Sequence, residues 1–130
     1  MTTKSILVID DDRDLTNSLK AYFEARGYGV RMAHSGADGM TEIQRERPDV
    51  LVLDIMMDTD ADGFNLAFKL KNDPANRDIP ILILSGFTDH MRDKSKSFEF
   101  VMERDWPAAE YLRKPASLPS IGAAVERLIA

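Results

Sequence analysis

Short runs of apolar residues alternate along the chain with segments in which apolar residues recur at helical spacing. The runs predict five strands, at about residues 5–10, 29–32, 50–53, 79–84 and 110–113. Helical segments lie between them and after the last one; in the charged stretch from Phe87 to Trp106, the helical spacing comes from Phe98, Val101 and Met102. This alternation is typical of βαβ units and predicts an α/β fold.

The helical segments also carry signals for where they begin, end and pack. Gly27 is a C-terminal stop for the first helix, Ser35 is a favourable N-cap for the second, and Pro48 prevents the second from continuing. In the first helix, one face carries Leu15, Leu19, Tyr22 and Phe23. The residues expected to be buried are Ala37, Met40 and Ile43 in the second helix and Ile121, Ala124, Val125, Leu128 and Ile129 in the last.

The first, third and fourth strands are continuous runs of Val, Ile and Leu. Such strands are buried on both faces, which is typical of a parallel sheet covered by helices on both sides. Because crossovers are right-handed, the expected strand order is 2-1-3-4-5, with a switch point between strands one and three. We therefore expect a doubly wound, five-stranded parallel sheet.

Composition narrows the class of protein. The chain has 130 residues, 44% of them hydrophobic and 30% charged, which is typical of one globular domain. It has no cysteine, no apolar run long enough to span a bilayer, and no signal peptide at its start, so a cytoplasmic location is expected. The net charge of −5 argues against direct binding to nucleic acid, and no membrane partner is expected because no apolar run is long enough.

Carboxylates follow two of the apolar strands. Asp10, Asp11 and Asp12 follow the first strand, and Asp54 follows the third. These strands flank the expected switch point, where ligands bind outside the carboxyl ends of an open sheet. The sequence therefore predicts one acidic crevice, to which strands four and five add Ser85 and Lys114.

Charge repulsion limits what this crevice can be. Two carboxylates about 4 Å apart repel by roughly 4 kcal/mol at an effective dielectric constant near 20. Lys114 supplies a single positive charge, so either a proton or a divalent cation must complete the site. Hard oxygen ligands in small number favour Mg²⁺ over Ca²⁺ or Zn²⁺.

Sites of this kind usually handle phosphate, and each residue then has an expected role. Asp54 is the best candidate for a nucleophile that becomes an aspartyl phosphate. Asp10 and Asp11 are better placed to hold the metal. Ser85 and Lys114 would hold the phosphoryl oxygens together with Mg²⁺.

These motifs resemble the receiver domain of two-component response regulators over nearly the whole chain. Residues 6–12 resemble the acidic first strand of that family, and residues 48–57 its phosphorylated strand. Residues 62–64 resemble the turn before its third helix, 79–86 the strand ending in a hydroxyl residue, and 111–115 its Lys-Pro motif. The resemblance implies a flavodoxin-like fold with five helices, in a single receiver domain over residues 1–130.

The resemblance also implies a function. A histidine kinase or phosphotransfer protein would pass phosphate to Asp54, making the chain a signalling module rather than a turnover enzyme. Asp11, Asp54 and the Met56 carbonyl would ligate Mg²⁺, with Asp10 acting mostly through water. Phosphorylation would draw in Ser85 and Lys114 and change the Tyr111 rotamer, switching the surface of the fourth helix, fifth strand and fifth helix. A downstream protein would read this surface, and a homodimer is compatible with it.

The chain departs from the family pattern in two segments. The loop after Met57 is about one residue longer and lacks the common proline, and the segment between Ser85 and Lys114 is longer than usual. Met56 and Phe87, two positions after Asp54 and Ser85, cannot hydrogen-bond an attacking water. We therefore expect slow self-hydrolysis of the phosphoaspartate.

Other interpretations remain open. A magnesium-dependent phosphatase would place its aspartate nucleophile on the first strand, which Asp10-Asp11-Asp12 permits. A flavodoxin-like binding module would need a phosphate loop there, and three aspartates repel phosphate. A degenerate receiver would only bind a protein partner.

Asp58, Asp60 and Asp62 alternate as in a calcium loop, but the distant glutamate of such a loop is missing. His34 and His90 are expected to be isolated and exposed.

Overall fold

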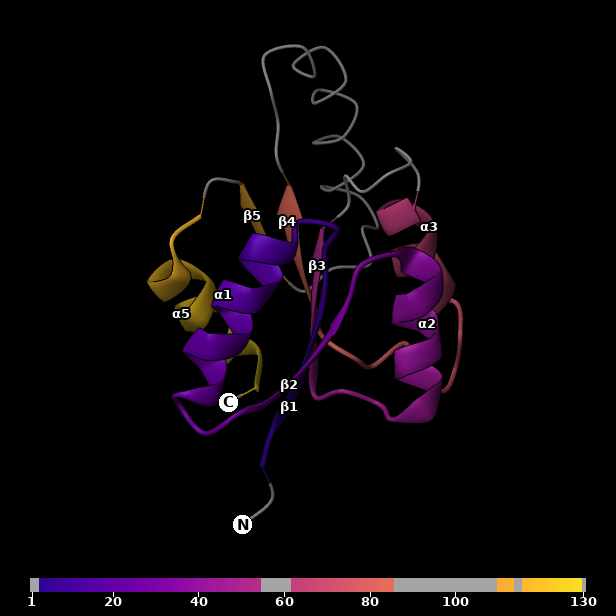
Figure 1. The fold of residues 1–130 in the computed structure, drawn as a ribbon. Coiled ribbons are helices and arrows are strands. Elements are labelled where there is room, and N and C mark those ends of the chain that lie inside the picture. Colours follow the sequence, from indigo (N-terminus) through magenta and orange to yellow (C-terminus); the bar gives the residue numbers. More distant parts are fainter. Residues whose placement is uncertain (1–2, 55–61, 86–109, 114–115, 130) are drawn as a thin grey trace.

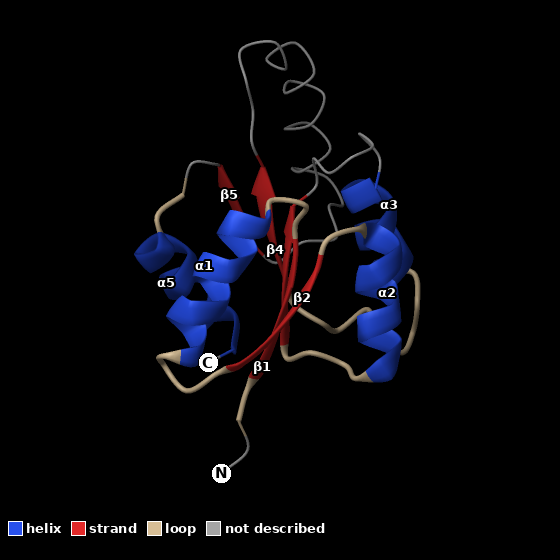
Figure 2. Ribbon diagram, viewed as in Figure 1, coloured by secondary structure: helices blue, strands red, loops and turns tan. Residues whose placement is uncertain are grey.

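The computed structural model describes residues 3–54, 62–85, 110–113 and 116–129. These residues form a parallel sheet with helices on both faces (Figures 1 and 2). The strands are β1 (Ser5–Ile9), β2 (Gly29–Ala33), β3 (Val50–Asp54), β4 (Ile81–Ser85) and β5 (Glu110–Arg113). The helices are α1 (Arg13–Glu24), α2 (Gly36–Arg45), α3 (Asp62–Lys71) and α5 (Leu118–Ile129). The helix expected between Phe87 and Trp106 lies outside the described residues.

The strand order is β2-β1-β3-β4-β5, and every described pair is parallel. The predicted α/β class, strand order and switch point between β1 and β3 are confirmed. The register pairs Ile9 with Leu53, Asp54 with Leu84, and Ser85 with Arg113. The carboxyl ends of four adjacent strands therefore lie at one edge of the sheet.

Side chains alternate along the central strands between two hydrophobic clusters, one on each face. Leu7, Ile9, Leu51 and Leu53 pack towards α2 and α3, whereas Ile6, Val8, Val50 and Val52 pack towards α1 and α5. All eight are fully buried. This burial on both faces is why the strands read as unbroken apolar runs.

The helix ends follow the predicted signals. Ser35 caps α2 by accepting a hydrogen bond from the Asp38 backbone N–H at 3.1 Å. Gly27 ends the α1 segment with a φ of 89°, a left-handed conformation that glycine adopts without steric cost. These two residues fix where the chain enters α2 and leaves α1.

The buried face of α2 differs from the prediction. Ala37 is exposed, Met40 is half-buried, and Gly39 and Ile43 are buried. A Cβ atom on Gly39 would overlap the side chain of Ile9, so the helix backbone lies directly against β1 at this point. The pattern of apolar residues did not indicate the buried face of α2 correctly, because a buried glycine has no hydrophobic side chain.

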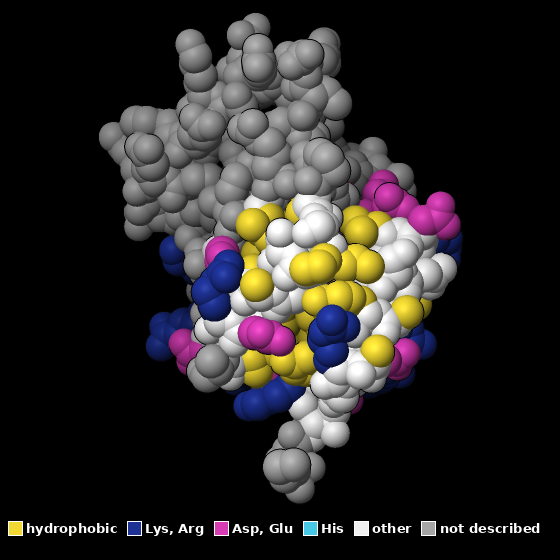
Figure 3. All heavy atoms as spheres, turned by 90° about the vertical axis from the view of Figure 1, so that its left-hand side faces the viewer, with side chains coloured by type: hydrophobic (Ala, Val, Ile, Leu, Met, Phe, Trp, Pro, Cys, Tyr) yellow, Lys and Arg dark blue, Asp and Glu magenta, His cyan; other side chains and the backbone are white. Residues whose placement is uncertain are grey.

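The surface over α1 and α5 carries a strip of apolar side chains bordered by charged ones (Figure 3). Leu15 and Tyr22 of α1 and Leu118 of α5 are partly buried and pack against this side of the core. Leu128 and Ile129 are also only partly buried, although the sequence suggested burial. Among the described residues, no helix is long and apolar enough to cross a membrane.

Candidate functional site

Three carboxylates meet at the carboxyl ends of β1 and β3. Asp10, Asp11 and Asp54 each offer an oxygen, and these three oxygens all lie within 4.8 Å of one another. Asp10 is 1% exposed and Asp54 is 3% exposed, while Asp11 is the most accessible of the three. The acidic cluster predicted at the switch point is thus present in the fold.

Backbone hydrogen bonds hold the chain that leads from β1 into α1. The Asp10 N–H donates to the Ala33 carbonyl at 3.1 Å, which extends the pairing of β1 with β2 by one residue. The Asp10 carboxylate accepts the Asp12 N–H at 2.9 Å, and the Asp12 carboxylate caps α1 by accepting the Leu15 N–H at 3.1 Å. Asp11 is therefore carried on a short turn that is fixed on both sides.

The charges in this cluster favour a cation. At a separation of 4.8 Å, two carboxylates repel by about 3.5 kcal/mol at an effective dielectric constant of 20. Oxygens bound to octahedral Mg²⁺ lie about 3 to 4 Å apart, given metal–oxygen distances near 2.1 Å. A spread of at most 4.8 Å is close to that requirement, so the donor type and spacing fit Mg²⁺.

The other predicted site residues lie at the same edge of the sheet or beyond the described part. Ser85 ends β4, one residue past the partner of Asp54, and Tyr111 lies in β5. Lys114 and Met56 lie outside the described residues. The backbone register places Arg113 beside Ser85.

One residue with an unexpected environment is His34, which directly follows β2. It is half-buried rather than exposed, and its Nε2 lies 3.2 Å from the Thr16 hydroxyl on α1. The expectation that His34 is isolated is wrong. Thr16 is fully buried on the same helical face as Leu19 and Phe23. This helical spacing was the feature of the sequence from which the burial of Thr16 could have been predicted.

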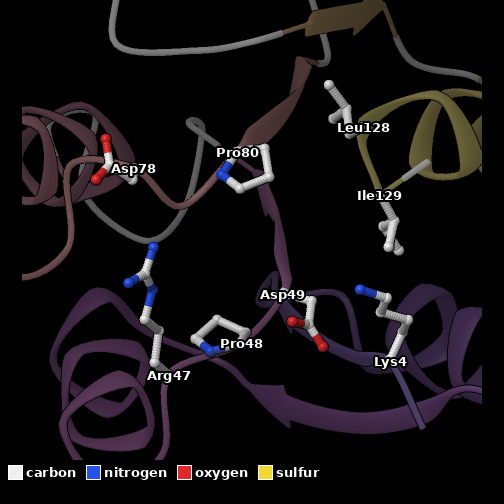
Figure 4. A pocket seen from close by; sticks show the side chains of 8 residues that line it. All are labelled: Lys4, Arg47, Pro48, Asp49, Asp78, Pro80, Leu128 and Ile129. Atoms are coloured by element: carbon white, nitrogen blue, oxygen red, sulfur yellow. The ribbon is translucent and has the colours of Figure 1, made fainter. Parts of the chain in front are cut away.

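A separate hollow of about 580 Å³ lies at the opposite end of the sheet (Figure 4). Its lining mixes charged residues with prolines and the end of α5: Lys4, Arg47, Pro48, Asp49, Asp78, Pro80, Leu128 and Ile129. On the same side of the fold, Glu110 at the start of β5 pairs with Arg127, and their hydrogen bond raises the pKa of Arg127. None of the predicted site residues lines this hollow.

Comparisons with known proteins agree with this geometry. A family model described as the response regulator receiver domain matches residues 6–126. Response regulator MprA from Mycobacterium avium is 37% identical over 124 residues, which are 95% of this chain and 50% of MprA. The chain thus spans about half the length of the curated relatives it matches.

Solved structures with the same fold include two receiver domains. One belongs to a signal transduction histidine kinase from Syntrophus aciditrophicus, with 27% identity, a TM-score of 0.81, and coverage of 98% of this chain and 90% of that chain. The other is a response regulator receiver domain protein from Clostridium thermocellum, with 26% identity, a TM-score of 0.78, and coverage of 97% and 94%. The chain therefore belongs to the response regulator receiver domain family of two-component signalling, and is a signalling module rather than a turnover enzyme.

Proposed function

We propose that Asp54 is the phosphoacceptor of this receiver, within one domain spanning residues 1–130. A carboxylate oxygen of Asp54 attacks phosphorus, forming a P–O bond while the P–N bond of a donor phosphohistidine breaks. The electron pair of that bond stays on the imidazole nitrogen, which leaves as neutral histidine once protonated. The product is an acyl phosphate on Asp54.

Asp10, Asp11 and Asp54 would hold Mg²⁺, together with the Met56 carbonyl. When bound, the ion supplies positive charge that offsets the repulsion between the carboxylates and the incoming phosphoryl group. Asp10 is nearly fully buried and already accepts the Asp12 N–H, so it is suited to a fixed supporting role. Asp11 is more accessible and faces fewer steric limits on binding an ion.

Ser85 and Lys114 would contact the phosphoryl oxygens after transfer. Ser85 supplies a hydroxyl and Lys114 a positive charge, so both bind the phosphorylated state better than the free state. Tyr111, on β5, would change rotamer with this shift. The partners we propose are a sensor histidine kinase or histidine phosphotransfer protein as donor and a downstream protein as reader, with homodimerisation as one form of readout. The chain would act in the cytoplasm.

The observation that carries this proposal is the convergence of Asp10, Asp11 and Asp54 within 4.8 Å. It is tested by incubating the protein with acetyl phosphate, with and without Mg²⁺, and counting phosphoryl groups by intact mass. We expect one phosphoryl group on the wild type only with Mg²⁺, and none on Asp54→Asn.

Asp78→Asn is a matched control, because Asp78 is an exposed aspartate at the opposite end of the sheet. It should be phosphorylated like the wild type. A label that persists on Asp54→Asn would refute Asp54 as the acceptor. Labelling of the wild type that is indifferent to Mg²⁺ would refute the metal site.

A further inference from the structure

A hydrogen bond joins the end of β2 to the first turn of α1. The Thr16 hydroxyl lies 3.2 Å from Nε2 of His34 and 3.1 Å from the carbonyl oxygen of Arg13. Thr16 is fully buried, and His34 is half-buried. A buried hydroxyl needs hydrogen-bond partners, and these two contacts provide them.

The direction of each hydrogen bond follows from counting protons. The Thr16 hydroxyl has one proton, and the Arg13 carbonyl can only accept. The arrangement that forms both bonds donates this proton to Arg13 and leaves the hydroxyl oxygen to accept from His34. In that arrangement Nε2 of His34 carries a proton and acts as the donor.

This bond closes a loop of contacts around the turn that bears Asp11. On one side, the Asp10 N–H donates to the carbonyl of Ala33, the residue before His34. On the other side, the Thr16 N–H donates to the Asp12 carbonyl at 3.0 Å. The acidic turn is thus tied to β2 at Asp10 and again, through Thr16 and His34, at the start of α1.

We propose that the His34–Thr16 hydrogen bond positions the acidic turn for Mg²⁺, so that both residues are positioning residues of the receiver site. This inference rests on the proposed function, because it concerns the same metal-binding carboxylates. Neither residue supplies a ligand. Residues that orient ligands typically change metal affinity by about tenfold or more when mutated, and a hydrogen bond one step further away should matter somewhat less.

The first test measures Mg²⁺ affinity by titrating the purified protein with Mg²⁺ and following backbone amide NMR shifts. Thr16→Val and His34→Leu should each raise the Kd for Mg²⁺ by about two- to tenfold, as expected for loss of one hydrogen bond. The double variant should show no further loss, because both changes remove the same contact. Thr16→Ser and His34→Gln, which keep an acceptor and a donor at these positions, should retain most of the affinity.

Thr41→Val is the matched control. The Thr41 hydroxyl on α2 makes the same kind of bond to a helix carbonyl, that of Ala37, at 3.1 Å, and no described residue of another element is bonded to it. Its Kd for Mg²⁺ should equal that of the wild type. His34→Leu lies at a half-buried position, so it keeps the test valid if Thr16→Val fails to fold.

The second test reads the imidazole directly by ¹⁵N NMR without Mg²⁺. We expect Nε2 of His34 to be protonated in the wild type, and its shift to move in Thr16→Val but not in Thr41→Val. A neutral ring protonated at Nδ1 alone, or a shift unchanged by Thr16→Val, would overturn the inference. The inference would also be overturned if the wild type binds Mg²⁺ and both Thr16→Val and His34→Leu bind it with the same affinity. A wild type that does not bind Mg²⁺ at all would instead identify the proposed function as the failure.

Discussion

Replacing Asp54 with asparagine should stabilise the fold when Mg²⁺ is absent. Asp54 is 3% exposed and lies with Asp10 and Asp11 in a cluster whose oxygens are within 4.8 Å of one another. Asparagine has nearly the same shape and removes one negative charge. The change therefore removes one charge from the cluster with little change in packing.

The size of the effect follows from Coulomb's law. At 4.8 Å, a carboxylate pair repels by about 1 kcal/mol with the dielectric constant of water and about 3.5 kcal/mol with an effective value of 20. Asp54 takes part in two such pairs, and asparagine makes weaker hydrogen bonds than a carboxylate, which offsets part of the gain. We expect a net gain of about 2 kcal/mol in the free energy of unfolding, or about 7 °C in Tm for a chain of this length.

Magnesium should reverse this order. At a concentration tenfold above its Kd, a ligand that binds only the folded state stabilises it by about 1.4 kcal/mol. The wild type should gain this amount, about 5 °C in Tm, whereas Asp54→Asn lacks one ligand and should gain much less. The assay is thermal unfolding by circular dichroism in EDTA and across a Mg²⁺ titration.

Asp78→Asn serves as the control for a general effect of charge. Its carboxylate is exposed and lies outside the acidic cluster, so its free energy of unfolding should stay within about 0.5 kcal/mol of the wild type. The reasoning would be refuted if Asp54→Asn were no more stable than the wild type in EDTA. It would equally be refuted if Asp78→Asn gained as much.

Three further outcomes are expected. Gly39→Ala should lower the free energy of unfolding in urea by about 1 to 3 kcal/mol, because its Cβ would overlap Ile9, even though alanine has the better helix propensity. The Cβ of Gly29→Ala would meet only ordinary contacts at 3.8 Å, so this variant should lose much less stability. Equal losses in the two variants would contradict this reasoning. Ser35→Ala should lose about 1 kcal/mol by removing the cap of α2, and Ser35→Asp should restore it. The phosphoaspartate should persist for minutes or longer after the donor is removed, because Met56 and Phe87 cannot orient water; loss within seconds would exclude this.

Much of the fold follows from local chemistry that the sequence shows directly. Strands buried on both faces, such as residues 50–53, must be apolar at every position, so their runs stand out. The Ser35 cap and the Gly27 turn depend only on neighbouring residues. The convergence of Asp10 and Asp54 was predictable too, because strand order and parallel direction alone bring their strand ends together.

Other features depend on contacts that no local pattern encodes. The Thr16–His34 bond joins residues 18 positions apart, and it exists because β2 ends beside the first turn of α1. Thr16 could be assigned to a buried helical face, but its partner could not be identified from spacing. Gly39 is buried because of the shape of Ile9 on a neighbouring element, which hydrophobicity does not report.

The most direct test of the central claim is to locate the phosphoryl group on the chain. After phosphorylation with phosphoramidate and Mg²⁺, borohydride reduces an acyl phosphate to homoserine, which peptide mass spectrometry assigns to one residue. We predict homoserine at position 54 and unmodified Asp10 and Asp11. Homoserine at position 10 would contradict the account, since it would make the carboxylate that accepts the Asp12 N–H the nucleophile.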